Sequence, residues 1–520
     1  MSSRRLSIAP LLKSQWTYIS LFAILGLLGI VNHSMWRDEM NVWLIAKYSH
    51  NFADFWDNVR YDRGHPGLWH LLVSIAFHIA DNPLAMQILH WAIGVLAIII
   101  FWLFSPFTHR QKILFSFGYL PFFENLLISR NYGLGMLFLF GICTAFNSRT
   151  KTYLGLACLL ALLANSNIYG LFIGVALTLT FILDFRFNDE SRKTFLHRHF
   201  TLLKLHPKID IFLSSIIVLI TFVIAAYMIL PPSQVVTEEV LTEIPTESNL
   251  ELFLISLGRI LGGYTLLIPN PDRLLDLVVC GIIALVIFFI SLTNFTKKPL
   301  PLFFFSFSTL TIFLFSYVSF PGRGPRHFGH FYLILIAALW IASYYPPQSW
   351  LENKIKFLRQ KQLKKTRLFV FMLLLYINFF CGIFRFGSDL FIPYSASQQV
   401  ANYLQNNQLQ DEFIVGNRDV NMAGVSGYLG QEIYYLERNN FGSFSLFLKQ
   451  ERQELDQEKV LQKLEKLLTT NAEGNLDKIL LIMHKKLKTS NPQLKIAAIA
   501  KFEHSWIGSE KYYLYWVYLQ

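Results

Sequence analysis

Long apolar segments separated by short polar ones make up the first three quarters of the chain. A transmembrane helix needs about 20 mostly apolar residues to cross the hydrocarbon core of a bilayer. The segments that approach or reach this length are residues 16–33, 84–106, 111–128, 133–147, 152–166, 168–185, 210–230, 273–293, 299–319, 327–346 and 367–386. The pattern therefore predicts a multi-pass α-helical membrane protein with about 11 transmembrane helices.

Two further apolar segments do not fit this description. Residues 66–81 are polar on one stripe, because His70, Ser74 and His78 recur at helical spacing. This predicts a helix that lies in the membrane interface rather than one that spans the bilayer. The pattern does not decide whether the segment 250–268 is a span or an interfacial or re-entrant helix.

The chain changes character after residue 386, where its composition becomes that of a soluble domain. Helical and strand-like segments follow one another, with helices expected near 396–407 and 456–469 and strands near 412–416, 432–436, 478–484 and 511–519. Such alternation predicts a small α/β domain. We therefore divide the chain into a transmembrane domain, 1–386, and an α/β domain, 387–520, with an acceptor-side or structural role.

Composition supports the membrane assignment, and charge orients the chain. The sequence is 53% hydrophobic and 15% charged, with a net charge of +12. The basic residues lie in alternate connections between apolar segments, which argues for membrane topology and against nucleic-acid binding. They place the N-terminus in the cytoplasm and the α/β domain outside the plasma (inner) membrane. The four cysteines lie inside apolar segments without metal or disulfide spacing, as inert thiols do.

Two carboxylates stand at the outer end of the first helix, within the predicted outer catalytic loop 34–83. Asp38 and Glu39 repel each other, which raises one pKa and leaves a usable base. A solvated acidic loop has the same appearance, so the pair alone does not decide. In the same loop, His65 begins the interfacial helix. It could bind a phosphate or a sugar hydroxyl, or simply start the helix.

Later outer connections add further candidate residues. Arg130 and Tyr132 lie in a very short loop, and Glu124 lies inside the preceding apolar segment. An intramembrane carboxylate indicates function, unless it forms a structural ion pair. Arg326 and His327 follow a glycine-rich turn. The guanidinium fork suits a lipid phosphate, although an arginine at a helix end can also extend towards the headgroups.

The predicted topology places these residues on one side of the membrane and therefore predicts an outward-facing active site. No nucleotide-binding loop, HExxH or GxSxG pattern occurs in the chain, and no metal-ligand spacing is found. We expect neither a cofactor nor a metal.

The order of these motifs resembles the GT-C fold integral membrane glycosyltransferases. The resemblance is to the protein O-mannosyltransferase and lipid A aminoarabinose transferase group, the family 39 and 83 type, and covers most of residues 16–390. It is carried by Trp36-Arg37-Asp38-Glu39 and by His65-Pro66 with Leu68. Arg130-Asn131-Tyr132 is similar to an Arg-x-Tyr element of some bacterial members. Gly67 departs from the second proline that is usual there.

The resemblance implies an inverting transfer of a sugar from a polyprenyl-phosphate donor to an acceptor hydroxyl on a glycan, lipid or protein. Asp38 would accept the proton of the hydroxyl, and Glu39 would hold the acceptor or tune Asp38. Arg326, with Arg130 or His65, would stabilise the departing lipid phosphate.

Two other classes of membrane protein remain as alternatives to a glycosyltransferase. A transporter or flippase would carry its ionisable residues near the bilayer midplane, where Glu124 is the main example here. A polysaccharide polymerase or O-antigen ligase would share the outer arginines and histidines but would not need Asp38 and Glu39.

Overall fold

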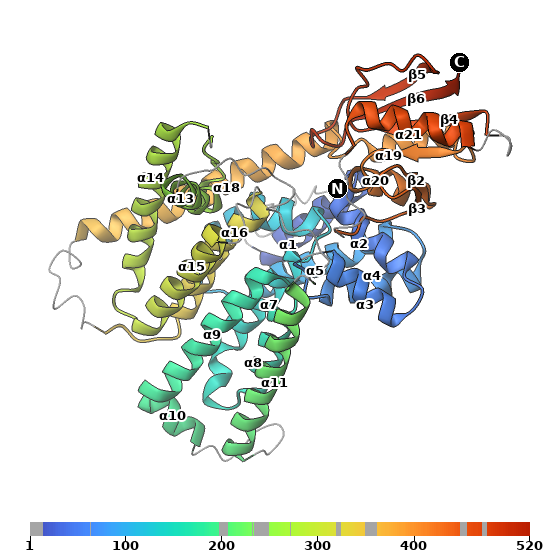
Figure 1. The fold of residues 1–520 in the computed structure, drawn as a ribbon. Coiled ribbons are helices and arrows are strands. Elements are labelled where there is room, and N and C mark those ends of the chain that lie inside the picture. Colours follow the sequence, from blue (N-terminus) through green and yellow to red (C-terminus); the bar gives the residue numbers. More distant parts are fainter. Residues whose placement is uncertain are drawn as a thin grey trace, which may run out of the picture.

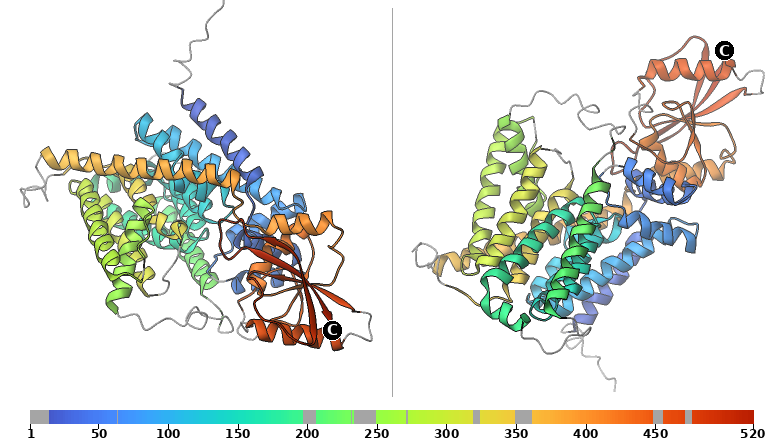
Figure 2. Two further views of the ribbon diagram at one scale, coloured as in Figure 1. Left: turned by 90° about the horizontal axis from the view of Figure 1, so that it is seen from above. Right: turned by 60° about the horizontal axis from the view of Figure 1, so that its bottom comes forward.

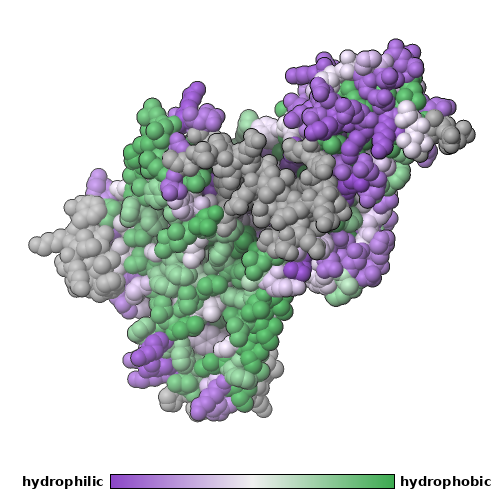
Figure 3. All heavy atoms as spheres, in the orientation of Figure 1, coloured by the Kyte–Doolittle hydropathy of each residue, from purple (hydrophilic) through white to green (hydrophobic). Residues whose placement is uncertain are grey.

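Helices form most of the protein, and a small sheet region lies at the C-terminal end of the chain (Figure 1). The computed structural model describes residues 14–62, 64–196, 206–230, 232, 249–270, 272–318, 324–348, 361–447, 455–470 and 476–520. The helical part has an apolar surface, whereas hydrophilic side chains gather on the C-terminal region (Figure 3). This distribution is that of a helical membrane protein with a polar C-terminal domain.

Among the described residues, seven helices are long and apolar enough to cross a membrane. They are α1 (Gln15–Asn32), α5 (Leu84–Phe104), α9 (Ile168–Phe187), α11 (Pro207–Ile229), α14 (Leu274–Leu292), α15 (Pro299–Val318) and α18 (Lys361–Phe391). The prediction of a helical membrane protein is confirmed by these helices, but the number of 11 spans is not. Helix α18 runs across the helical part and leads into the C-terminal domain (Figure 2).

Three of the other predicted spans form shorter or more deeply buried helices. Helices α7 (Tyr132–Ala145) and α8 (Leu154–Ala164) have 14 and 11 residues. Helix α16 (Pro325–Ala342) has 18 residues and is almost completely buried from Phe328 onwards. Its neighbours are other helices, so its apolar residues form part of the protein interior.

The predicted span 111–128 is broken in two. Helix α6 (His109–Ser116) ends before Gly118, and the π-helix η2 (Tyr119–Leu127) follows. Pro121 lacks an N–H group, which weakens regular α-helical bonding at this point. Helix α18 passes close to the break. A Cβ atom on Gly382 of α18 would lie only 2.4 Å from the carbonyl oxygen of Phe117. π-Helical turns are rare and are frequently found at functional sites.

The segment left open from the sequence, 250–268, forms helix α13 (Asn249–Thr265). It packs against α14 and α16. A Cβ atom on Gly263 would lie 2.1 Å from the carbonyl oxygen of Phe328 in α16, so the two backbones approach as closely as glycine allows.

The predicted interfacial helix is α4 (Leu68–Ile79), which at 12 residues is too short to span a bilayer. Its outward stripe is apolar: Leu71, Ile75 and Ile79 are 36%, 53% and 80% exposed. Of the polar residues that recur along this helix, His70 is buried on the side away from the apolar stripe, whereas His78 is exposed. An exposed apolar stripe on a short helix fits contact with lipid at the interface.

The remaining elements of the helical part are short. They are α2 (Arg37–Tyr48), α3 (Phe52–Tyr61), the 3₁₀ helix η3 (Phe146–Thr150), α10 (Asp189–Leu196) and the 3₁₀ helix η4 (Thr293–Phe295). Helices α2, α3 and α4 connect α1 to α5 and carry the predicted catalytic loop.

The C-terminal domain is a six-stranded sheet with helices on both faces. The strand order is β3-β2-β1-β4-β6-β5, and the strands are β1 (Ile414–Gly416), β2 (Ile433–Tyr435), β3 (Asn440–Gly442), β4 (Lys478–Met483), β5 (Leu494–Phe502) and β6 (Tyr512–Leu519). Helices α19 (Ser397–Asn406) and α20 (Asp419–Leu429) pack on one face, and α21 (Gln457–Thr470) packs on the other. Strand β1 is parallel to β2 and β4.

The predicted α/β domain is present, but the sequence did not predict α20, β3 or β5. Helix α20 carries Gly424 and Gly427, which lower helix propensity. The structure needs both, because added Cβ atoms would lie 2.8 Å from Ser397 and 2.7 Å from the sulfur of Met40. Close packing against α2 and α19 therefore explains why glycine occupies these two positions, and the two glycines explain why the helix was not predicted.

The C-terminal domain lies directly on the predicted catalytic loop (Figure 1). The main-chain N–H of Met35 donates to the hydroxyl of Tyr428 at 2.8 Å, and that of Arg37 donates to Glu510 Oε1 at 3.0 Å. The amide of Asn41 exchanges two hydrogen bonds with the main chain of Ser445. The domain thus holds the beginning of α2 in place.

Candidate functional site

Asp38 lies in the first turn of α2, where the free N–H groups of a helix favour a carboxylate. Its side chain is 26% exposed, so it can reach a bound molecule. Two guanidinium groups from distant parts of the chain contact one of its oxygens: Arg130 Nη1 and Arg326 Nη2 each lie 3.3 Å from Asp38 Oδ2. The fold therefore brings together three of the residues that the sequence singled out.

Arg130 is additionally anchored on the backbone of α2. Its Nη1 atom donates to the main-chain carbonyl of Asp38 at 2.7 Å, and its side chain is only 9% exposed. The arginine is thus fixed in the short connection between η2 and α7, with its charge directed at the beginning of α2.

Arg326 comes from the first turn of α16 and lies over the ring of Trp36, with 4.7 Å between the guanidinium carbon and the ring centroid. Its Nε atom is buried and makes no hydrogen bond to any residue that the structure describes. A buried guanidinium N–H without an acceptor is costly. Arg326 therefore has a donor available for an anion beside Asp38.

Glu39 points in a different direction from Asp38 and is 0% exposed. Its Oε1 atom accepts from the Ser129 N–H at 2.6 Å. Its Oε2 atom accepts from the Trp36 N–H at 3.2 Å and lies 3.1 Å from His33 Nε2. The other ring nitrogen of His33 lies 2.7 Å from Asp389 in α18. Of the two roles predicted for Glu39, this geometry favours tuning Asp38 through its position over holding an acceptor.

We expect Glu39→Gln to destabilise the protein by about 1–3 kcal/mol, because a buried amide cannot accept all the hydrogen bonds of the carboxylate. Thermal unfolding in detergent should show the loss. Glu432→Gln, on an exposed residue, is the matched control. An unchanged unfolding temperature would contradict this structural role of Glu39.

His65 lies at the edge of this group, just before α4. Its Nδ1 atom accepts from the side-chain amide of Asn131 at 3.3 Å, and its Nε2 atom lies 3.7 Å from Asp62. Asp62 also accepts from Asn41 at 2.7 Å and lies 3.2 Å from His70 Nε2. The loop before α4 is thereby tied to α2 and to the Arg130 connection.

The structure explains why Gly67 stands where the family that the sequence resembles usually has a second proline. Its φ angle is +98°, in the left-handed region, whereas proline is restricted to about −65°. A Cβ atom on Gly67 would also lie 2.4 Å from the ring of Trp56. Glycine is therefore required here by both the backbone conformation and the packing.

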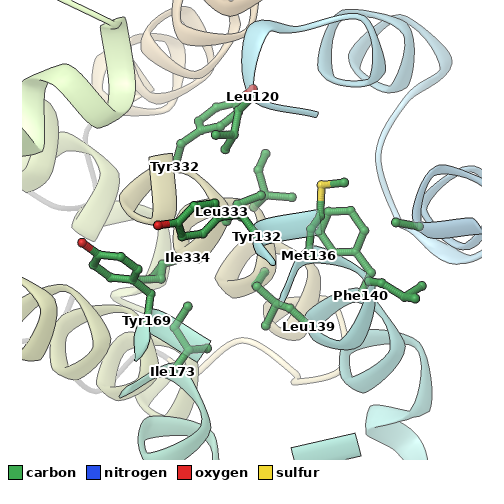
Figure 4. Packing of buried hydrophobic residues seen from close by; sticks show 14 of the residues in the cluster. Leu120, Tyr132, Met136, Leu139, Phe140, Tyr169, Ile173, Tyr332, Leu333 and Ile334 are labelled. Atoms are coloured by element: carbon green, nitrogen blue, oxygen red, sulfur yellow. The ribbon is translucent and has the colours of Figure 1, made fainter. Parts of the chain in front are cut away.

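Tyr132 and His327 meet behind the arginines. The hydroxyl of Tyr132 lies 3.2 Å from Nδ1 of His327. Tyr169 stacks on His330, with 4.3 Å between ring centroids. Tyr132 and Tyr169 belong to the same packed cluster, in which α7, α9 and α16 meet (Figure 4). Tyr132 thus contacts the residue that follows Arg326 in α16.

Glu124 lies on the π-helix η2, apart from the Asp38 contacts. Its Oε1 atom accepts from the hydroxyl of Tyr119 at 2.7 Å, and its buried Oε2 atom has no hydrogen-bond partner within the described part of the chain. None of the described residues forms a salt bridge with it, so the structural ion pair considered from the sequence is not present there.

The charges around the loop have opposite effects on two groups that lie outside the spans. Burial alone would raise the pKa of Asp38, but the charges of Arg130, Arg326 and Arg37 outweigh it and hold the pKa below its ordinary value of 3.8. Burial, reinforced by Arg130, lowers the pKa of His65 to about 3 against the opposing charge of Asp62. Asp38 is therefore ionised and His65 neutral at physiological pH.

Several residues of the site carry no signal in the sequence. His33, Asp62 and Arg385 are ordinary polar residues near helix ends until the fold gives them partners. Arg385 of α18 is 5% exposed, and its guanidinium carbon lies 3.6 Å from the ring centroid of Trp506 in the C-terminal domain. Only long-range packing brings these partners together.

Comparison with known protein families finds no match for this chain, and no curated protein matches it either. The arrangement of the side chains is therefore the basis for assigning a function.

Proposed function

We propose that this protein is an inverting glycosyltransferase that moves a sugar from a polyprenyl-phosphate donor to an acceptor hydroxyl. The observation that carries the proposal is the ionised Asp38 carboxylate held 3.3 Å from both Arg130 and Arg326. A base beside two phosphate-binding groups is the combination that such a transfer needs. With the N-terminus in the cytoplasm, the site faces outward from the plasma membrane.

In the transfer, Asp38 accepts the proton of the acceptor hydroxyl while that oxygen forms a bond to the anomeric carbon. The bond from the anomeric carbon to the phosphate oxygen breaks, and its electron pair goes to the lipid phosphate. Arg326 and Arg130 stabilise the charge that grows on the phosphate. Attack from the face opposite the leaving group inverts the anomeric configuration.

A carboxylate with a depressed pKa is a weak base, and donor binding corrects this. In the free protein both guanidinium groups are directed at Asp38. A lipid phosphate that binds Arg326 through its unpartnered Nε shares the positive charge of that group. The pKa of Asp38 then rises towards its ordinary value, so the base becomes effective when the donor is in place.

The donor class is tested with membranes that contain the protein and a panel of radiolabelled sugars. We expect transfer from polyprenyl-phosphate sugars and none from nucleotide sugars, with one sugar added per acceptor. Membranes without the protein are the control. A ladder of repeating units would indicate a polymerase, and movement of lipid-linked sugar across the bilayer without transfer would indicate a flippase. Either result would overturn the proposal.

A further inference from the structure

A buried histidine connects the beginning of α2 to the end of α18. His33 follows the last residue of α1, and its side chain is enclosed by the protein. Its Nε2 atom lies 3.1 Å from Glu39 Oε2 in α2, and its Nδ1 atom lies 2.7 Å from Asp389 Oδ2 in α18. Both carboxylates are buried as well. The imidazole ring therefore lies between two carboxylates that come from opposite ends of the helical part of the chain.

The two contacts favour a doubly protonated ring. A neutral imidazole has one N–H and would direct a lone pair at one of the two carboxylates. Burial alone would lower the pKa of His33, but the charges of Asp389 and Glu39, together with their hydrogen bonds, outweigh it and raise the pKa to about 10. His33 is therefore an imidazolium at physiological pH and donates one hydrogen bond to each carboxylate.

The carboxylate of Glu39 is in turn bonded to two main-chain N–H groups beside the arginines of the candidate site. It accepts from Ser129 at 2.6 Å and from Trp36 at 3.2 Å. Ser129 immediately precedes Arg130, and the ring of Trp36 lies against the guanidinium group of Arg326. The orientation of the Glu39 side chain therefore affects the position of both arginines.

In the described part of the chain, His33 is the only side chain that forms a hydrogen bond with Glu39. Without the positive charge of His33, the buried carboxylates of Glu39 and Asp389 would lie on either side of an uncharged group. Removing one partner from a buried ion pair leaves an uncompensated charge, which is strongly unfavourable. Glu39 would then change its orientation or take up a proton, and in either case its bonds to the main chain would weaken.

We propose that His33 is a positioning residue, which holds Glu39 so that Arg130 stays aligned with Asp38. This role rests on the proposed function. His33 does not touch the reacting atoms and acts through Glu39. Because Asp389 belongs to α18, the alignment of the base depends on a helix that supplies none of the reacting groups.

His33→Gln in the full-length protein tests the proposal, since the amide keeps one donor group but carries no charge. Transfer by the folded protein in nanodiscs is measured as a function of pH. We expect kcat to fall about tenfold to a hundredfold, because a displacement of about 1 Å in a catalytic site can cost this much. The pH below which transfer declines should also rise, because Arg130 is the foremost of the charges that lower the pKa of Asp38. A residue that only stabilised the fold would not move this pH.

His50→Gln is the matched control, because this histidine is exposed shortly after the end of α2. It should leave kcat and the pH profile unchanged. An unchanged pH profile in folded His33→Gln protein would refute the positioning role, whether or not kcat falls. If His33→Gln does not fold, the double variant with Asp389→Asn decides by the same criterion, since it removes one positive and one negative charge together.

Binding of a polyprenyl phosphate separates this role from the proposed function. If the unaltered protein transfers no sugar, the proposed function fails, and the affinity for this lipid in nanodiscs then tests the position of Arg130. His33→Gln should bind the lipid about tenfold more weakly, which is about 1.4 kcal/mol. Equal affinity of the two proteins would refute the positioning role. An unaltered protein that neither transfers sugar nor binds the lipid would refute both proposals.

Discussion

Asn in place of Asp38 should abolish sugar transfer while the protein still inserts into membranes and folds. The amide has nearly the shape of the carboxylate but cannot take the acceptor proton. General-base assistance is worth about 10²–10⁴-fold, so the remaining rate should fall below the detection limit of a membrane assay. The measurement is transfer of labelled sugar per unit of protein, normalised to expression.

The matched control for this variant is Asp57→Asn, which removes an exposed carboxylate from α3 in the same loop. It should retain full activity. Full activity in Asp38→Asn would exclude the role of base, whatever the effect of other substitutions.

The pH dependence of transfer offers a second measurement on Asp38. The base must be ionised, and Arg130 and Arg326 hold its pKa below 3.8 in the free protein. Transfer at subsaturating donor and acceptor should therefore decline only below about pH 4 as the medium is acidified. A decline near pH 6 would point to another titrating group as the base.

Arg326→Ala should have the second largest effect, a loss of about 10²–10³-fold in kcat. Removing a preorganised donor from a site where charge develops typically costs this much. The substitution also removes one of the arginines that lower the pKa of Asp38. The acid limit, meaning the pH below which transfer declines, should therefore move to higher pH. A purely structural arginine would not shift that limit.

Arg273→Ala is the control for this variant, because Arg273 is exposed at the start of α14 and is predicted to lie on the same side of the membrane. It should leave both kcat and the acid limit unchanged. A short-chain soluble donor analogue adds a further comparison. Equal weakening of donor and acceptor by Arg326→Ala would count against a phosphate-binding role.

Much of the architecture follows from local pattern. Segments such as 84–106 and 168–185 form the expected helices because long apolar stretches cannot leave their backbone unpaired in lipid. The strands near 478–484 and 511–519 are found because apolar β-branched and aromatic runs favour sheets. Pro121 is visible in the sequence, but the close approach of Gly382 to the break at Gly118 is not, because the two glycines lie far apart along the chain.

The candidate site, too, is partly predictable from local sequence and partly decided by the tertiary structure. The sequence by itself determined that this is a helical membrane protein with a small α/β domain, because hydropathy acts locally along the chain. It also singled out Asp38, Arg130 and Arg326, but its choice of Asp38 over Glu39 as the base came only from the family resemblance. Neighbouring residues of a helix point about 100° apart. Only the tertiary structure shows that Asp38 meets two guanidinium groups whereas Glu39 is buried against His33, because long-range packing decides which neighbour each side chain finds.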